Sequence, residues 1–333
     1  MKNIFIIMSF ALTLFLLVIA GAFLWGYQQY NQKGTLAETR LFQIEKGQGV
    51  VSIADNLATA GIITRPLLFR IVARMNNADR SLQAGEYEFS PEISMAQVLQ
   101  KLVQGDIYQR QFTIPEGLTS WQIVQILNRI EALPGTITEI PAEGSLLPET
   151  YNYFSGETKQ DKINQMQEAM TQTLETLWLE RKNEAPVLSK AEVMILASIV
   201  EKETAVSAER RRIAGVFLNR LKMGIKLQTD PTVIYALTSG KIREEGQGPL
   251  GRRLLGKDLQ FESPYNTYKY PGLPPGPIAN PGKASLAAVL DPEIHDYYYF
   301  VADGTGGHVF SKTLEEHNRN VARWRKIRKQ NNL

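Results

Sequence analysis

The longest apolar run in the chain lies at its N-terminus. No charged side chain occurs between Lys2 and Lys33, and residues 4–27 are almost entirely apolar. About twenty apolar residues cross a bilayer as a helix, so the pattern predicts a transmembrane anchor within residues 1–30. A cleaved signal peptide is the alternative, but its apolar core is shorter and ends at small residues. Because Lys2 precedes the run, the pattern favours an N-terminus inside and everything after residue 30 outside.

A polar spacer, residues 31–41, leads from this run to three segments that share one pattern. Each begins with a short alternating strand, passes a Gly or Pro turn and continues with apolar residues at helical spacing. The strands are expected at residues 42–47, 85–89 and 111–117, and a further helix is expected at 66–75. Such units are typical of small α+β folds, and they suit either a carbohydrate-binding module or plain packing.

The most informative helix begins after the capping sequence Ser189-Lys-Ala-Glu192. At ~100° per residue, Ile195, Leu196, Ile199 and Val200 fall on one face, and Glu203 falls among them. Glu201 falls on the opposite face, where it is expected to behave as a surface carboxylate.

A carboxylate on an apolar face is costly unless it is paired, protonated or beside a cleft. Desolvation raises a carboxyl pKa, and a carboxyl that stays protonated near neutral pH acts as a general acid. The pattern leaves three interpretations of Glu203 open: a catalytic acid, a structural partner of a nearby arginine such as Arg210 or Arg220, or an exposed residue at a frayed helix end.

Further candidates lie in loops after this helix. Gln228, Thr229 and Asp230 precede a helix that starts at Pro231, although N-capping alone explains Asp230. Residues 263–282 are dense in proline, glycine and aromatics, and they suit a sugar groove or a covering loop. A hairpin over residues 297–310 and a basic helix over 314–328 are expected to close the chain. The expected substrate contacts are Glu149, Gln228, Thr229, Asp230, Tyr235, Tyr265, Asn266, Tyr268 and Asn280.

The amino-acid composition limits the classes of function and the side chains that are available for catalysis. The chain has 333 residues, 44% hydrophobic and 21% charged, which is ordinary for folded domains and excludes wholesale disorder. Its net charge of +3 does not indicate a nucleic-acid binder. It has no cysteine and three histidines, His295, His308 and His317, whose spacing matches no common zinc motif. We therefore expect no metal or cofactor, and chemistry built on carboxylates, hydroxyls, amides and aromatics.

Several long strings together resemble one family. They are EGSLLPETY, LASIVEKETAVSAERRRIAGVFLNRL, LQTDPTVIYAL, YNTY, GLPPGPIANPG and FVADGTGGHVFS, in this order. The chain resembles the endolytic murein transglycosylases, the YceG-like family, over nearly its whole length. The resemblance implies that Glu203 is the catalytic acid/base. It also implies an α+β architecture: an N-terminal transmembrane helix, a small LysM-like α/β glycan-binding module over residues 42–110, and a larger mixed α+β catalytic domain over residues 111–333.

The resemblance also implies a reaction, cleavage of the β-1,4 bond between N-acetylmuramic acid and N-acetylglucosamine in peptidoglycan without water. One carboxyl protonates the leaving oxygen and then deprotonates the muramyl C6 hydroxyl, which closes onto C1 as a 1,6-anhydro ring. The implied location is the bacterial inner (cytoplasmic) membrane, with the catalytic domain on the periplasmic side. Peptidoglycan strands, the membrane and penicillin-binding synthases are the partners to expect.

Two other classes stay open at this point. A lysozyme-type muramidase would use Glu203 as acid and Asp230 or Glu149 as the second carboxylate. A non-catalytic scaffold of cell-wall synthesis would bind glycan and synthases without cleaving anything. The mass of the product separates the first from a transglycosylase, and a Glu203→Gln variant separates the second.

Overall fold

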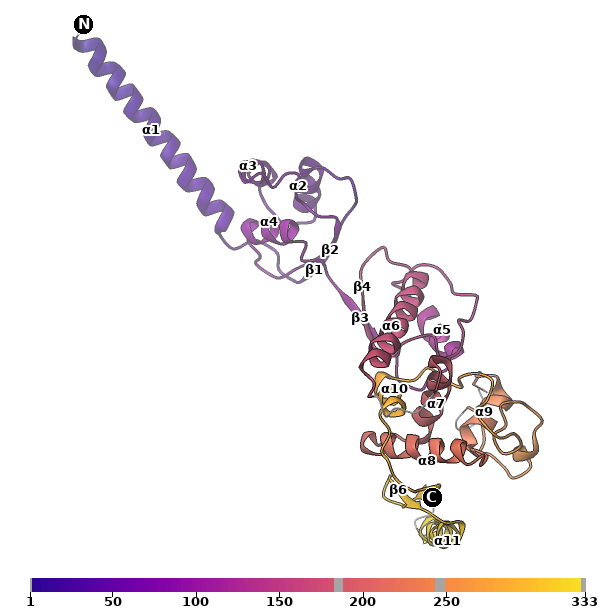
Figure 1. Ribbon diagram of the computed structural model, residues 1–333. Helices are drawn as coiled ribbons and strands as arrows, with labels where there is room; N and C mark the ends of the chain where they lie inside the picture. Colours follow the sequence, from indigo (N-terminus) through magenta and orange to yellow (C-terminus); the bar gives the residue numbers. More distant parts are fainter. Residues whose placement is uncertain (1, 183–187, 243–248, 331–333) are drawn as a thin grey trace. The chain divides into compact units, whose positions relative to one another are not determined.

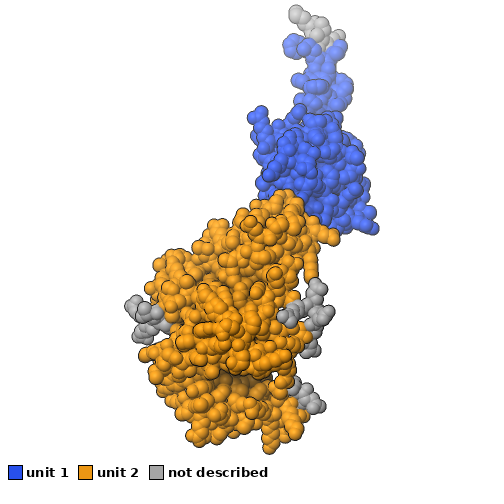
Figure 2. Space-filling view, turned by 90° about the vertical axis from the view of Figure 1, so that its right-hand side faces the viewer, with its two compact units in different colours: residues 1–110, 152–155 blue, residues 111–151, 156–333 orange. Residues whose placement is uncertain are grey.

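The chain folds into a mixed α+β structure, as the hydrophobic pattern predicts. The computed structural model describes residues 2–182, 188–242 and 249–330 (Figure 1). Two compact units divide it, residues 1–110 with 152–155 and residues 111–151 with 156–333 (Figure 2). Strands β3 (Arg110–Thr113) and β4 (Thr150–Tyr153) pair as one of three two-stranded sheets in the described part of the chain.

Unit 1 begins with the helix α1 (Lys2–Asn31). Most of its described apolar side chains are exposed, for example Phe5 at 78% and Phe10 at 72%. Residues Phe5–Asn31 are long and apolar enough to cross a membrane. The predicted apolar helix is therefore present, with a surface that water would solvate poorly.

The rest of unit 1 packs around a core of its own. Its elements are β1 (Arg40–Ile44), α2 (Val50–Thr59), α3 (Pro66–Met75), β2 (Gly85–Phe89) and α4 (Met95–Gln104). The two strands are antiparallel, with Phe42 opposite Tyr87. Tyr87, Phe89 and Phe69 are fully buried at the centre. The expected strand at 85–89 and helix at 66–75 are both confirmed.

Residues 31–41 are folded onto unit 1. The Gly34 amide donates to the Glu92 carbonyl over 3.0 Å, and the Glu92 amide donates to the Leu36 carbonyl over 2.9 Å. Leu36 is only 8% exposed and belongs to the core of unit 1. A polar composition alone did not reveal these backbone pairings.

Unit 2 is mainly helical and ends in a hairpin and a helix. Its helices and its second pair of strands are α5 (Ser120–Asn128), α6 (Lys159–Glu180), α7 (Lys190–Glu203), η1 (Ser207–Glu209), α8 (Arg210–Lys222), α9 (Asp230–Thr238), η2 (Asp258–Gln260), α10 (Lys283–Leu290), β5 (Tyr299–Ala302), β6 (His308–Ser311) and α11 (Leu314–Gln330). The expected closing hairpin and terminal helix are confirmed, with Phe300 opposite Phe310 in the hairpin.

Helix α7 is the centre of unit 2. The Ser189 hydroxyl accepts from the Glu192 amide and the Glu192 carboxylate accepts from the Ser189 amide, so the predicted capping box is confirmed. Every residue from Val193 to Val200 is buried. The expectation of a single apolar face was therefore wrong, because α6, α8 and α10 pack around the helix on several sides (Figure 1).

Candidate active site

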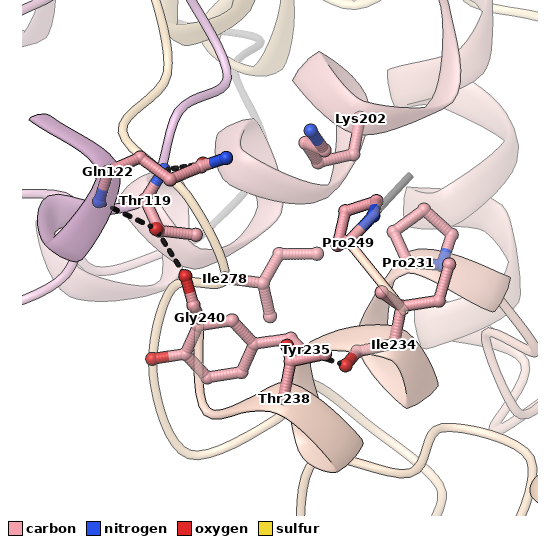
Figure 3. Close-up of a pocket in the computed structure, with 10 residues that line it drawn as sticks. All are labelled: Thr119, Gln122, Lys202, Pro231, Ile234, Tyr235, Thr238, Gly240, Pro249 and Ile278. Atoms are coloured by element: carbon pink, nitrogen blue, oxygen red, sulfur yellow. Dashed lines mark hydrogen bonds between the residues drawn. The ribbon is translucent and has the colours of Figure 1, made fainter. Parts of the chain in front are cut away.

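The last three residues of α7 send their side chains to three different places. Glu203 ends the helix, and Thr204 follows in extended conformation with φ −144°. Glu203 lines a cavity of 640 Å³. Lys202 lines a separate cavity of 180 Å³, shown in Figure 3, and its ammonium donates to the Gly117 carbonyl over 3.1 Å. Glu201 turns into the protein.

The larger cavity brings together parts of the chain that are far apart in sequence. Its walls come from α8, the loop before α9, the 268 region, β5 and α11. Of the predicted contacts, it gathers Gln228, Thr229, Asp230 and Tyr268 around Glu203. The other lining residues are Phe217, Arg220, Leu227, Tyr299, Phe300, Val301, Leu314, His317, Asn318, Val321 and Arg325.

Thr229 holds the Glu203 carboxyl. Thr229 occupies the N-cap position of α9, but its hydroxyl makes no capping bond and donates instead to Glu203 Oε1. The N-cap was expected at Asp230, which is instead the first helical residue. Thr267 fixes this loop, since its hydroxyl accepts from the Thr229 amide over 3.1 Å and bonds to the Thr232 hydroxyl at 2.9 Å.

Two further groups beside Glu203 are held by defined partners. The Tyr268 hydroxyl donates to Asp230 Oδ1 over 2.6 Å. Arg220 is 7% exposed, and it donates from Nε to the Tyr298 carbonyl over 2.6 Å and from Nη1 to the Leu227 carbonyl over 2.7 Å. Its guanidinium also lies 5.2 Å from the centre of the Tyr299 ring. Arg220 thus ties α8 to both the loop before α9 and the hairpin.

The surroundings of Glu203 make its carboxyl easier to protonate than that of an ordinary glutamate. Burial raises the pKa of its carboxyl to about 6, and the neighbouring Asp230 carboxylate adds to the rise. The Thr229 hydroxyl, His308 and Arg220 lower that pKa, but by less. With a pKa near 6, about one carboxyl in ten is protonated at pH 7, which suits a group that must both give and take a proton.

A second cavity adjoins Glu203. It has a volume of 390 Å³ and is lined by Glu203, Thr204, Ala205, Ala302, Gly304, Gly306, Gly307, His308 and Trp324. Glu209 fixes the hairpin here, since its carboxylate accepts from the His308 amide at 2.9 Å and bonds to His308 Nδ1 at 2.7 Å. Glu203 therefore lies where two cavities meet.

Glu201 is not the surface carboxylate expected from the helical wheel. Its side chain is only 5% exposed. Its Oε2 accepts from the Gly282 amide over 2.9 Å, and its Oε1 lies 3.5 Å from Nη2 of Arg210. The expectation was wrong because the 272–282 loop covers the side of α7 that the wheel left to solvent.

The two predicted asparagines are used within the protein. Asn266 and Asn280 have no exposed surface. Asn266 donates to the carbonyls of Leu259 and Phe261 and accepts from the Tyr268 amide. Asn280 Oδ1 accepts from the Leu146 amide, and its Nδ2 donates to Leu118, Ser120 and Glu143. These amides shape the loops that carry them.

The remaining predicted residues lie away from Glu203. Tyr235 lines the cavity of Figure 3, and its ring lies 4.9 Å from that of Tyr265. Glu149 is exposed and lines neither cavity that contains Glu203. Of the two candidates for a second carboxylate, only Asp230 shares a cavity with Glu203.

Sequence reasoning missed several residues of the cavity wall. Arg220 was considered only as an ion-pair partner, and Trp324 and Tyr299 were placed on closing elements without a role. His317 lines the cavity as well: its Nδ1 is buried without a hydrogen-bond partner among the described residues, and its ring stacks on Tyr299 at 5.2 Å. The aromatic run 297–300 was the available signal. Across the described ranges, no group of three or more His, Asp or Glu side chains is placed to hold a metal ion.

Comparisons with known proteins agree with one another. The profile of the YceG-like family matches residues 42–323. A Bacillus subtilis protein named endolytic murein transglycosylase is 35% identical, over 91% of this chain and 90% of its own length. A Streptococcus pneumoniae protein of the same name is 30% identical over 84% of this chain, which spans 57% of that longer protein. The crystal structure of a putative YceG-like protein from Listeria monocytogenes is 33% identical, with a TM-score of 0.51 over 85% of this chain and 99% of that one.

Proposed function

This chain belongs to the YceG-like family, as its motifs indicate, and on that premise we propose that it is an endolytic murein transglycosylase that uses Glu203 as its catalytic acid/base. Its relatives carry that name at 35% and 30% identity. A lytic transglycosylase is a lyase acting on peptidoglycan. The observation that carries the assignment of Glu203 is its position in a cavity with a carboxyl pKa raised to about 6.

The proposed reaction needs one proton donor and returns its proton. Protonated Glu203 gives its proton to the bridging glycosidic oxygen as the bond from that oxygen to the muramyl C1 breaks. The C6 hydroxyl of the same sugar then bonds to C1 and loses its proton to the Glu203 carboxylate. Glu203 ends protonated, no water is consumed, and the products are a 1,6-anhydromuramyl end and a free hydroxyl. Thr229 supports both halves because its hydroxyl holds the carboxyl in place.

The two cavities support cleavage inside a strand. An endolytic enzyme must bind sugars on both sides of the bond it cuts, so its acid must lie between two binding regions. Glu203 lines both the 640 Å³ cavity and the 390 Å³ cavity. We propose that the glycan continues from one into the other across Glu203, with Tyr268, Tyr299 and Trp324 as aromatic walls.

The position of Asp230 favours a lysozyme-type mechanism as the second candidate function. Asp230 lines the same cavity as Glu203, and a second carboxylate is what a hydrolytic mechanism requires. However, Asp230 already accepts a hydrogen bond from Tyr268 at 2.6 Å, a role that suits a residue shaping the cavity.

The proposal also assigns roles to unit 1, as a membrane anchor and as a glycan-binding module. We propose that α1 anchors the chain in the inner membrane with unit 2 on the outer, periplasmic side, and that residues 42–110 are a LysM-like glycan-binding module. Their separate core supports an independent module. Cutting near the membrane would place the enzyme beside nascent strands, so penicillin-binding synthases are the protein partners to test.

The decisive experiment digests purified glycan strands with the wild type, Glu203→Gln and Glu201→Gln. Glu203→Gln keeps the hydrogen-bonding shape but cannot transfer a proton, and its rate should fall at least ~10²–10⁴-fold. Glu201→Gln is the matched control, because its amide oxygen still accepts from Gly282, and it should keep most activity.

Mass spectrometry of the products tests the reaction type. Anhydro ends are lighter by one water than the ends that a hydrolase makes. Products heavier by one water would make the chain a muramidase. Full activity of Glu203→Gln would remove the proposed catalytic role altogether.

A further inference from the structure

Helix α3 of unit 1 exposes a stripe of large apolar side chains. Leu67, Ile71 and Met75 are 64%, 47% and 67% exposed, and they recur every four residues, so they share one side of the helix. Phe69 and Ala73, on the other side, are 0% exposed and belong to the core. Half of this short helix therefore faces the core, and the other half presents an apolar surface with no cover in the described chain.

Contacts between α3 and α1 show which part of α1 lies beside this stripe. The Arg65 guanidinium lies 4.9 Å from the centre of the Trp25 ring, and Arg65 Nε donates to Gln29 Oε1 over 2.9 Å. Leu68 Cδ1 lies 3.7 Å from the point where a Cβ on Gly26 would be, so α3 packs directly against α1 there. The start of α3 is thus level with residues 25–29 of the apolar helix.

If α1 spans a bilayer, its length places residues 25–29 at the edge of the hydrocarbon core. A helix rises about 1.5 Å per residue, so the roughly twenty residues before Trp25 span about 30 Å, the thickness of the hydrocarbon core. Trp25, Tyr27 and Tyr30 then fall where aromatic residues collect at membrane surfaces. Because α3 packs beside them, its apolar stripe falls at the same depth.

The surroundings of the stripe match a lipid surface in shape and in charge. A groove of 410 Å³ runs between α1 and α3, and it is lined by Ala22, Phe23, Gly26, Tyr27, Tyr30, Asn31, Leu68, Ile71, Val72, Met75 and Asn76. Three arginines, Arg65, Arg70 and Arg74, belong to α3 or its N-cap. Arg70 lies 3.5 Å from Asp55, and the segment as a whole is positively charged. Cations beside an apolar face are typical of helices that lie in the headgroup region.

We propose that α3 is an interfacial helix that lies in the membrane leaflet at the C-terminal end of α1. Leu67, Ile71 and Met75 insert among the acyl chains, lipid tails fill the groove against α1, and the arginines meet phosphate headgroups. Unit 1 is then held against the bilayer at two sites. The proposal rests on α1 being a membrane anchor, and it is independent of the chemistry at Glu203.

Site-specific quenching tests the proposal in the full chain. The chain has no cysteine, so single Leu67→Cys, Ile71→Cys and Met75→Cys variants each take one environment-sensitive fluorophore. Each labelled chain is placed in nanodiscs of phosphatidylglycerol and phosphatidylethanolamine that carry quenchers at a shallow or a deep acyl position. Phe15→Cys in α1 reports on the anchor, and Leu41→Cys in β1, at a residue that is 41% exposed, is the matched control.

The expected result is strong shallow-quencher quenching at 67, 71 and 75, deep-quencher quenching at 15 and weak quenching of both kinds at 41. Quenching at 15 with no more at 67, 71 and 75 than at 41 would overturn the interfacial helix and leave the anchor intact. Absence of quenching at 15 as well would overturn both. Circular dichroism of each labelled chain confirms that the substitutions at exposed positions leave the fold unchanged.

Discussion

At the scale of single residues, the site depends on how three neighbouring side chains diverge at the end of α7. Glu201 bonds to the Gly282 amide inside the protein, Lys202 bonds to the Gly117 carbonyl, and Glu203 lines the two cavities. Their chemistry differs because their partners differ. Glu203 has the Thr229 hydroxyl as its partner and lines a polar cavity, whereas Glu201 has an amide donor and an arginine.

The Thr229 hydroxyl should set the pH range over which Glu203, the proposed acid, is protonated. Its hydrogen bond favours the carboxylate and lowers the pKa of Glu203, while burial holds that pKa near 6. Wild-type kcat/KM should therefore decline as pH rises above about 6, because the protonated acid is lost. Thr229→Val should shift this decline to higher pH, and Thr229→Ser should restore it. A pH–rate profile identical in all three would show that the hydroxyl has no effect on the acid.

The raised pKa of the Glu203 carboxyl should also make the stability of the folded state depend on pH. A folded-state pKa near 6 lies above the ordinary value of 4.5, so the folded state loses stability as pH rises through 6. Glu203→Gln removes this loss, so at pH 8 its free energy of unfolding should exceed that of the wild type by up to about 2 kcal/mol. It should accordingly unfold at a higher temperature. Below pH 4.5 the two should converge. A difference in melting temperature that does not change with pH would contradict a Glu203 carboxyl with a raised pKa.

At the scale of elements, α8 is positioned by its contacts with the segment before the hairpin. The Glu293 amide donates to the Arg211 carbonyl over 3.0 Å, and Asn219 Nδ2 donates to the His295 carbonyl over 2.8 Å. These contacts hold Arg220, on the same helix, at the wall of the cavity. Displacing α8 would therefore move part of the proposed active site.

Gly215 is what allows this close approach. A Cβ at Gly215 would lie 2.5 Å from the Glu293 carbonyl oxygen and 2.7 Å from His295 Nε2. Gly215→Ala should therefore destabilise the protein by about 1–3 kcal/mol, although alanine is the better helix former. Gly256→Ala is the control, since its Cβ would meet nothing within 4 Å. Denaturant unfolding of both variants checks this, and equal stability would show that the segment yields freely.

At the scale of the whole molecule, the folded part of unit 1 begins before the end of α1. Tyr30 packs against the core of unit 1, and Leu36 is part of that core. A cut through residues 31–41 would damage the unit, while a cut before Trp25 would remove only the apolar helix. The boundary between anchor and folded chain is thus set by packing rather than by polarity.

A chain that lacks residues 1–24 should be recovered without detergent and should still cleave isolated glycan strands to anhydro products. The reason is that Glu203 and both cavities lie in unit 2 and Tyr30 is retained. Sedimentation and product analysis check the two parts. A well-folded truncated chain without activity on isolated strands would show that the apolar helix contributes to catalysis itself.

The sequence by itself determined the features that depend on neighbouring residues. The apolar helix α1, the capping box of Ser189 and Glu192, and the closing hairpin all follow from local pattern and local hydrogen bonds. The position of Glu203 at the end of an apolar helix was also readable, and the family motif pointed to the same residue.

Tertiary structure alone decided which of the candidate residues meet. The Thr229 hydroxyl reaches Glu203 from 26 residues away, and Asn280 bonds to the Leu146 amide from 134 residues away. A helical wheel assumes one buried face, and it placed Glu201 in solvent because it could not include a loop 81 residues distant. Hydrogen-bond saturation and burial depend on such distant contacts, so residue type and spacing could nominate site residues but could not separate those that line a cavity from those that build its walls.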